Sequence, residues 1–265
     1  MPQPLHNAGY GAEGFATTTS TPVSVWIVET IRHRVAIVLA GGRGRRMGAQ
    51  RNKVLHDLHG RPIIAWAIEA FAGHPDIDEV VVIGNRDDLA DLRLVAQKVD
   101  ESIAVIEGGA ERPDSERAAL EHLRTRIESG TIGLVAIHDG ARPLVDHHLI
   151  NRVIHAVGGK NGIVGAIPVL ASPPLIQLAD DDVRTLGHLS LVRAQTPQAF
   201  DARLLLRAYD EARREGFVGT DTSSYVERVC GDDEKIVGVL GDDRNLKVTF
   251  KDDLARANAL AIDQK

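Results

Sequence analysis

The sequence has a single cysteine, Cys230, among its 265 residues. One cysteine excludes an internal disulfide and any metal site built from several thiolates, so a reducing cytoplasm is the expected location. The sequence also lacks any apolar run near the ~20 residues that a membrane-spanning helix requires. Basic residues are not in surplus, because the formal net charge is −6. A nucleic-acid binder or an anionic-membrane binder would need a broad basic surface, and neither partner is expected.

Residues 1–22 are poor in charge and rich in Gly, Thr, Ser and Pro, with Glu13 as the only formally charged side chain. The first Lys or Arg of the chain is Arg32, and the apolar run 23–28 is shorter than the core of a usual secretory signal. We therefore expect residues 1–34 to form a partly disordered N-terminal extension and residues 35–262 to form the functional domain.

Short apolar runs alternate with helical patterns after residue 34. The runs that predict strands lie at 35–40, 79–84, 103–108, 132–139, 162–169 and 234–241. The patterns that predict helices lie at 63–72, 87–98, 114–128, 146–157, 201–215 and 251–262. Asp114 or Ser115 is expected to cap the third of these helices. Nearly continuous apolar strands that alternate with helices predict an α/β fold, a single Rossmann-like, mostly parallel twisted sheet with helices on both faces.

The alternation breaks at 170–194, where weak strand signals surround Pro173 and Pro174 and an acidic turn lies at 180–182. We expect a projecting β-arm in this segment. Its apolar side chains would be poorly covered on a lone subunit, so they predict a homodimer formed through the arm. These side chains are Leu170, Leu175, Ile176, Leu178 and Leu189.

A glycine-rich turn follows the first predicted strand, in 35-VAIVLAGGRGRRMGAQRNKVL-55. It does not match GxxxxGK[ST], and the third glycine of GxGxxG is replaced by Met47. Gly41, Gly42 and Gly44 would let backbone N–H groups approach an anion closely. The cations of the same segment are Arg43, Arg45, Arg46, Arg51 and Lys53. The turn is thus either a polyphosphate site or a solvated basic loop.

Polar or glycine-rich segments follow several other predicted strands. They are 108-GGAERPDS-115, 138-HDGARP-143, 195-QTPQAF-200, 220-TD-221 and 245-NLKVT-249. Because α/β folds bind ligands at the carboxyl ends of their strands, these segments predict a shared cleft.

With these segments in this order behind the glycine-rich turn, the chain resembles the 2-C-methyl-D-erythritol 4-phosphate cytidylyltransferases and the related ribitol 5-phosphate cytidylyltransferases. The resemblance covers residues 35–262. The family has a lysine six residues after an Arg-Met pair, and Met47 and Lys53 keep that spacing. The resemblance implies transfer of CMP from CTP to an alcohol phosphate, with release of pyrophosphate, in non-mevalonate isoprenoid synthesis.

The resemblance also implies roles for individual residues. Arg46 and Lys53 would be catalytic, acting with Mg²⁺ at the triphosphate. Nucleotide-binding residues would be Ala40, Gly41, Gly42, Gly44, Gly108, Gly109, Arg112, Ser115, Asp139 and Arg142. Among them Ser115 and the glycines before it would read the base, Asp139 would orient the metal–phosphate assembly or the ribose, and Arg142 could equally be structural. Acceptor-binding residues would be His188, Thr196, Thr220 and Lys247, while Asp221 could cap a helix.

The chain departs from the family's usual pattern in three places. Asn52-Lys53-Val54 stands where Pro-Lys-Gln is usual, residues 171–174 replace an Asp-Thr-hydrophobic-Lys string, and His188 replaces an arginine. The last two lie on the arm, which in the family helps to hold the acceptor phosphate. Three hypotheses stay open: the methylerythritol phosphate enzyme, a cytidylyltransferase for another polyol phosphate such as ribitol 5-phosphate, and a catalytically weak nucleotide-binding paralogue.

Overall fold

The computed structural model describes residues 32–41, 52–158, 161–172, 176–179, 182–185 and 191–262. Residues 32–265 form one compact unit. The proposed N-terminal extension up to residue 31, most of the glycine-rich turn and His188 lie outside the described residues. Within the described part of the chain, no helix combines the length and the apolar character needed to cross a membrane.

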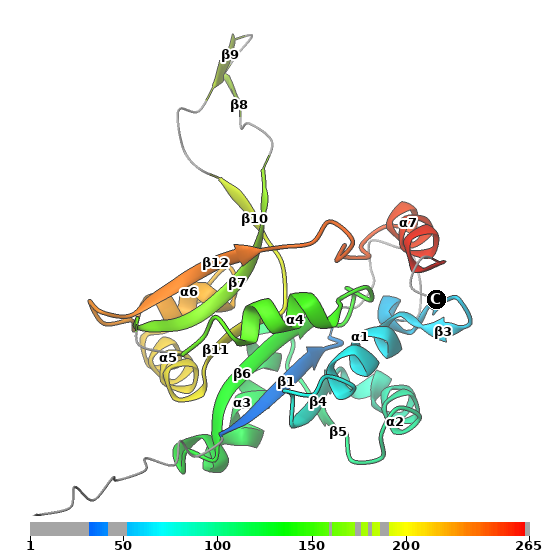
Figure 1. The fold of residues 1–265 in the computed structure, drawn as a ribbon, viewed down its shortest axis with the longest axis horizontal. Coiled ribbons are helices and arrows are strands. Elements are labelled where there is room, and N and C mark those ends of the chain that lie inside the picture. The colour runs from blue at the N-terminus through cyan, green and yellow to red at the C-terminus, as the bar shows by residue number, and fades with distance from the viewer. Residues whose placement is uncertain are drawn as a thin grey trace, which may run out of the picture. The chain divides into compact units, whose positions relative to one another are not determined.

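One mixed sheet of eight strands forms the centre of the unit (Figure 1). Its strands are β1 (His33–Leu39), β4 (Glu79–Gly84), β5 (Ala104–Glu107), β6 (Ile132–Asp139), β7 (Ile163–Ala171), β10 (Val192–Ala194), β11 (Gln198–Asp201) and β12 (Lys235–Leu240). Their order is β10–β7–β11–β6–β1–β4–β5, and β12 also pairs with β7. The strands β6, β1, β4 and β5 are parallel, as are β7 and β12. The antiparallel pairings all involve β10 or β11.

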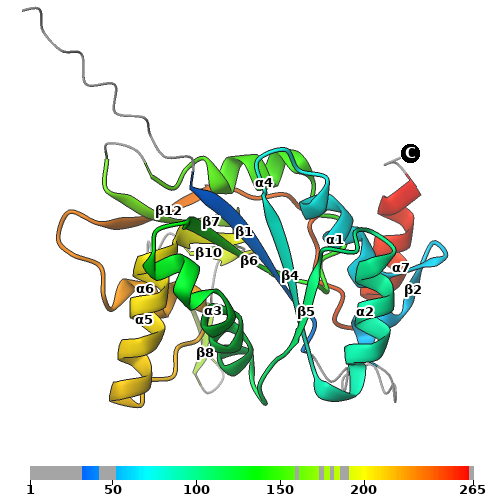
Figure 2. The same cartoon turned by 90° about the horizontal axis from the view of Figure 1, so that it is seen from below.

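Helices cover both faces of this sheet. They are α1 (Ile63–Ala72), α2 (Leu89–Gln97), α3 (Arg112–Glu128), α4 (His147–Ile154), α5 (Ala202–Glu215) and α6 (Thr222–Glu227). A further helix, α7 (Lys251–Ala261), packs instead against the short strand at Leu58 and the start of α1. One buried apolar cluster joins α1, α2 and α4 to the sheet, and a second joins α3, α5 and α6 to it. Figure 2 shows α1 and α4 on one side of the strands and α3 and α5 on the other.

The alternation of side chains along β1 explains why both faces need cover. Ala36 and Val38 belong to the first cluster, whereas Val35 and Ile37 belong to the second, and all four are 0% exposed. A strand whose two faces are both apolar is stable only between two layers. The predicted α/β class, with a mostly parallel sheet between helices, is confirmed.

Two short hairpins stand outside the main sheet. The first pairs β2 (Asp57–Leu58) with β3 (Arg61–Pro62), and the second pairs β8 (Ile176–Ala179) with β9 (Asp182–Thr185). Figure 1 shows β8 and β9 apart from the eight-stranded sheet, beyond β7 and β10. The second hairpin lies within the segment that was expected to form an arm.

The start of α3 differs from the expectation. The helix begins at Arg112, its N-cap is Glu111, and Asp114 accepts a hydrogen bond from the N–H of Glu111 at 3.3 Å. Asp114 or Ser115 as the cap is therefore wrong. Pro113 in the first turn suits this earlier start, because proline needs no intrahelical donor there. The early start places the side chain of Arg112 at the carboxyl edge of the sheet.

Candidate functional site

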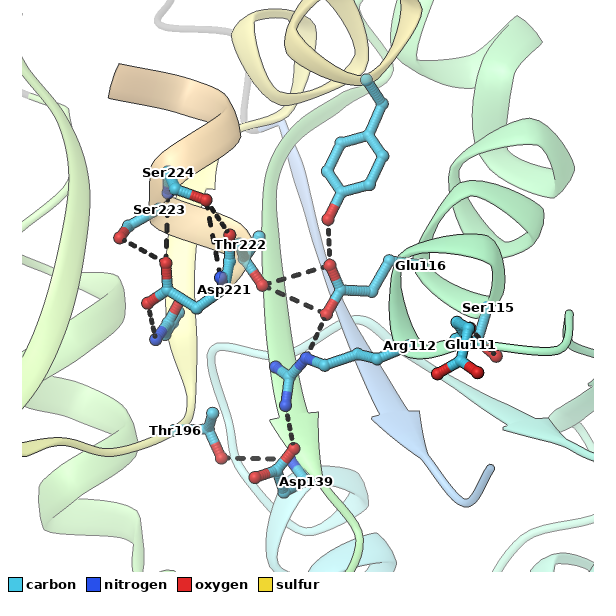
Figure 3. Close-up of polar contacts among 12 residues, drawn as sticks. Glu111, Arg112, Ser115, Glu116, Asp139, Thr196, Asp221, Thr222, Ser223 and Ser224 are labelled. Atoms are coloured by element: carbon cyan, nitrogen blue, oxygen red, sulfur yellow. Dashed lines mark hydrogen bonds and ion pairs between the residues drawn. The ribbon is translucent and has the colours of Figure 1, made fainter. Parts of the chain in front are cut away.

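The carboxylate of Asp139 lies at the carboxyl end of β6 among three basic side chains. Arg112 Nη1 binds its Oδ1, as Figure 3 shows, and Lys247 Nζ lies 2.8 Å from its Oδ2. Arg142 Nε lies 3.6 Å from the same Oδ2. The three cations come from the start of α3, the turn after β6 and the segment after β12. The structure thus brings together four of the predicted site residues that lie far apart in the sequence.

The charge of this cluster is not balanced. Burial alone would raise the pKa of Asp139, which is 7% exposed, but the charges of Arg112 and Lys247 hold that pKa well below its usual range. Asp139 is therefore an anion at neutral pH, and the three cations around it exceed its charge. The side chains of Arg112 and Lys247 are 33% and 41% exposed, so the excess positive charge is accessible to an anion.

Contacts between the segment that carries Lys247 and the end of β6 fix the position of this lysine. The N–H of Val248 donates to the carbonyl of Ala141 at 2.8 Å. Arg142 Nη1 donates to the carbonyl of Asn245 at 2.7 Å. Arg142 therefore has a structural role, because it ties the segment that carries Lys247 to the turn after β6. Its role in nucleotide binding stays a prediction.

A chain of hydrogen bonds ties Thr196 to the backbone of Asp139. The N–H of Asp139 donates to Thr196 Oγ1 at 3.0 Å, and the same oxygen lies 3.2 Å from Nδ1 of the fully buried His138. Asn245 Nδ2 donates to the carbonyl of Thr196 at 2.7 Å. Thr196, 4% exposed, thus holds the end of β6 in place, and the role of its hydroxyl in acceptor binding stays a prediction.

The two glycines before α3 pack against that helix. A Cβ on Gly108 would lie 2.6 Å from Ser115 Oγ, and a Cβ on Gly109 would overlap Asp114. A Cβ on Gly41 would lie 3.4 Å from the same Ser115 hydroxyl, and the carbonyl of Gly41 accepts from Asn85 Nδ2 at 3.1 Å. The structure therefore brings Gly41, which follows β1, close to Gly108 and Ser115 of the segment between β5 and α3. A site that reads a base with backbone groups would require such a grouping.

Asn52 fixes the two ends of the glycine-rich turn. Its Nδ2 donates to the carbonyl of Ala40 at 2.6 Å and to Asp88 Oδ2 at 2.8 Å, and its Oδ1 accepts from the N–H of Val54 at 3.3 Å. Lys53 begins the short 3₁₀ helix Lys53–Leu55 directly after it. These bonds join the segment before the glycine-rich turn to the segment after it.

The remaining predicted residues are less informative. Gly42, Gly44, Arg46 and His188 lie outside the described residues. Thr220 is exposed at the bend before α6, and its role in acceptor binding stays a prediction. The expected cap at Asp221 is confirmed, because its side chain accepts from the N–H of Ser224 at 3.2 Å.

Glu116 is a residue of this region that the sequence reasoning missed. Its Oε1 accepts from Arg112 Nε at 2.6 Å, and Figure 3 shows it between Arg112 and Thr222. A signal was present in the sequence, because Glu116 precedes Leu120 and Leu123 by one and two helical turns. That spacing places a carboxylate on the apolar face of α3, where an isolated charge is costly.

The described residues offer few ligands for a metal ion. Among the described residues, no group of three or more His, Cys, Asp or Glu side chains could hold a metal ion. Asp139 can supply a single carboxylate within its cluster of cations. That donor set fits a magnesium ion held mainly by phosphate oxygens and water, because Mg²⁺ commonly takes only one or two protein carboxylates beside a nucleotide.

The fold and the site define an α/β protein whose sheet carries, at its carboxyl edge, a cluster of three cationic side chains around the carboxylate of Asp139. The sequence profile of the 2-C-methyl-D-erythritol 4-phosphate cytidylyltransferases matches residues 34–262. A relative of that name from Shouchella clausii is 34% identical over 229 residues, which cover 85% of this chain and 95% of the relative. Another, from Bacillus cytotoxicus, is 35% identical over 227 residues, or 84% and 95% of the two chains. The chain belongs to this family.

A solved structure agrees with this assignment. The crystal structure of 4-diphosphocytidyl-2C-methyl-D-erythritol synthase from Anaerococcus prevotii matches with a TM-score of 0.73 and 27% identity. The match covers 88% of this chain and 99% of that chain.

Proposed function

We propose that the protein transfers CMP from CTP to 2-C-methyl-D-erythritol 4-phosphate and releases pyrophosphate. Membership of the family supports the reaction. The structural observation that supports this reaction is the cluster around Asp139. Arg112, Arg142 and Lys247 all approach its carboxylate. A reaction between a triphosphate and a phosphate monoester needs such an excess of positive charge, since both reactants are anions.

The proposed chemistry needs no general base. The attacking group is a phosphate monoester, whose second pKa is ~6, so it is already a dianion at neutral pH. Arg46 and Lys53 stabilise the charge that accumulates around the α-phosphorus, and Lys247 faces the acceptor phosphate. The backbone of Gly108 and the hydroxyl of Ser115 read cytosine. These roles agree with a site that is rich in fixed donors and cations rather than in paired carboxylates.

Magnesium is the proposed cofactor. When bound, it neutralises phosphate oxygens and favours departure of pyrophosphate. Asp139 is the described carboxylate positioned to hold it, and Lys247 and Arg112 keep that carboxylate ionised at neutral pH. The cytoplasmic location also stays a prediction.

A second acceptor is favoured by one feature of β7. This strand ends at Ala171, and Ser172 donates through its N–H to the carbonyl of Leu191 at 3.3 Å. The family usually has Asp-Thr at these two positions, so the acceptor pocket has lost a carboxylate there. Ribitol 5-phosphate is therefore the alternative acceptor to test.

Pyrophosphate release with CTP and Mg²⁺ tests the proposal, with the two acceptors assayed in parallel. Turnover with methylerythritol phosphate is expected. Lys53→Ala is the inactive control and should lower kcat by a factor of ~10²–10³, as the loss of one charge-stabilising donor usually does. Turnover with ribitol 5-phosphate alone would favour the alternative, and CTP binding without turnover would favour a nucleotide-binding paralogue.

We also infer a homodimer formed through the arm. Support comes from exposed apolar side chains beside the end of β7, namely Leu191, Val192 and Leu240, which are 38%, 53% and 73% exposed. They lie on or beside β10 and β12, the two strands that pair with β7. Burial against a second subunit would remove this apolar surface from water. Light scattering at micromolar concentration that detects only monomer would refute the inference.

A further inference from the structure

A buried carboxylate, that of Glu116, binds the guanidinium of Arg112. Glu116 is 1% exposed and shares the covered face of α3 with Leu120 and Leu123, which are both 0% exposed. Replacement of a buried ion pair by apolar residues is often neutral or stabilising, so packing alone does not account for a charge at this position. Its contacts indicate a different role.

Three elements fix the carboxylate of Glu116. Tyr209 of α5 donates its hydroxyl to Oε2, and Thr222 of α6 places its hydroxyl 3.2 Å from both carboxylate oxygens. Arg112, one turn earlier on α3, donates its Nε to Oε1. Burial raises the pKa of Glu116, and these three donors oppose that rise. Of the three partners, Arg112 is the one that extends to Asp139 (Figure 3).

The guanidinium of Arg112 is therefore held at two points. Its Nε binds Glu116 and its Nη1 binds Asp139, so the planar group cannot rotate without breaking a charge-assisted hydrogen bond. Burial alone would lower the pKa of Arg112, but the two carboxylates raise it above its usual value. Lys247, by contrast, contacts Asp139 through its ammonium group alone, and 41% of its side chain is exposed.

We propose that Glu116 is a positioning residue for nucleotidyl transfer, which holds the guanidinium of Arg112 against Asp139 so that CTP meets a cation already in place. Tyr209 and Thr222 hold Glu116 in turn. A donor fixed in advance stabilises an anionic ligand without a cost for ordering it on binding. The expected change in the KM for CTP rests on the proposed function. The fixed position of the Arg112 guanidinium can be tested without turnover.

Glu116→Gln is the first variant to measure. It keeps the size of the side chain and removes the charge that binds Arg112. We expect the KM for CTP to rise by about tenfold or more, as loss of a buried charged hydrogen bond would do, while the KM for the acceptor phosphate changes much less. Glu79→Gln is the matched control, because it removes a carboxylate that binds Arg126 on the same helix, at 2.5 and 3.0 Å. That control should leave both KM values unchanged.

A double-mutant cycle tests whether Glu116 acts through Arg112. In an Arg112→Met background, Glu116→Gln should cause no further change in the KM for CTP, since the group that it positions is gone. Additive effects of the two substitutions would overturn the proposal. So would a Glu116→Gln enzyme with an unchanged KM for CTP.

Proton–nitrogen NMR of the arginine Nε–H groups separates this inference from the proposed function. In nucleotide-free protein, we expect a slowly exchanging Arg112 signal, assigned by its loss in Arg112→Lys. Glu116→Gln should abolish its protection and Glu79→Gln should preserve it. A protected signal in folded Glu116→Gln would overturn the positioning role whatever the activity. No pyrophosphate release by the wild type with either acceptor would instead refute the proposed function.

A second variant covers the case in which Glu116→Gln does not fold. The double substitution Tyr209→Phe, Thr222→Val removes the two hydroxyls that anchor Glu116 and leaves Arg112 and Asp139 unchanged. The Nε–H signal of Arg112 should then lose protection, and the KM for CTP should rise severalfold. A folded protein with an unchanged signal and an unchanged KM would overturn the proposal.

Discussion

The hydrogen bonds around His138 determine its protonation state and predict a specific dependence of stability on pH. Its Nε2 lies 3.0 Å from the carbonyl of Arg142, so this nitrogen carries the proton. Its Nδ1 then accepts from the hydroxyl of Thr196, whose oxygen accepts from the N–H of Asp139. The neutral ring completes this chain of bonds. A second proton would bring a charge into a site that is 0% exposed and close to two arginines.

The size of the effect follows from the pKa of His138. Burial lowers that pKa from 6.5 to about 4. Between these values the unfolded chain binds a proton that the folded protein does not, so stability falls as the pH falls from 6.5 toward 4. A pKa difference of this size corresponds to about 3 kcal/mol of unfolding free energy, at ~1.36 kcal/mol for each pH unit. Above pH 6.5 the contribution is fully present.

The assay is urea unfolding followed by far-ultraviolet circular dichroism at pH 7, 6 and 5, in EDTA and without nucleotide. The comparison protein is His138→Gln, whose amide keeps a donor for the carbonyl of Arg142 but does not titrate. Wild type should lose about 1 kcal/mol per pH unit more than the variant between pH 6 and pH 5. Carboxylates that titrate in both proteins change both unfolding free energies equally, so they do not affect the difference between wild type and variant. Parallel loss of stability in the two proteins would refute the assignment of a buried neutral histidine.

Two further predictions concern Asn52 and Lys247. Asn52→Ala removes the donor to the carbonyl of Ala40 and to Asp88, and should lower the unfolding free energy by about 1–3 kcal/mol in the same urea assay. An unchanged value would mean that the ends of the glycine-rich turn are held by other contacts. Lys247→Met should raise the KM for the acceptor by about tenfold or more, with a smaller change for CTP, in the pyrophosphate assay. A larger effect on CTP would assign Lys247 to the nucleotide side.

The order of elements could be predicted from the sequence because the apolar runs are continuous and well separated. The bounds of β4, β6 and α1 agree with the expected ranges to the residue. The strand β11 was missed, since its four residues, Gln198–Asp201, contain only two apolar side chains. It also lies antiparallel between β6 and β7, and a short strand inserted in this way leaves no periodic signal along the chain.

Part of the site could be predicted from the order of the strands. Charged residues at the ends of parallel strands must lie at one edge, so the proximity of Arg112 and Asp139 follows from the topology. The segment that carries Lys247 was predicted to lie at the same edge, but the role of the lysine came from family resemblance. The contacts of Glu116 with Tyr209 and Thr222 were not predictable, since they depend on how three helices pack beneath the sheet.

The cations beside Asp139 differ in how firmly they are held: Arg112 has two carboxylate partners, whereas Lys247 has a single contact with Asp139 and an exposed side chain. Arg112 is bound at two points, and one of its partners, Glu116, is buried, so an incoming ligand cannot replace it. Lys247 contacts Asp139 through one ammonium group on a flexible chain, and 41% of its side chain is exposed. A phosphate that binds beside Asp139 can therefore draw Lys247 away from Asp139 by a change of rotamer. Asp139 would then still hold Arg112 through its Oδ1, while its Oδ2 would lose its contact with Lys247. Before an anionic substrate binds, Asp139 neutralises part of the charge of Lys247. When the substrate arrives, Lys247 can pair with it instead of with Asp139. An acidic protein can in this way keep a cation at its binding site.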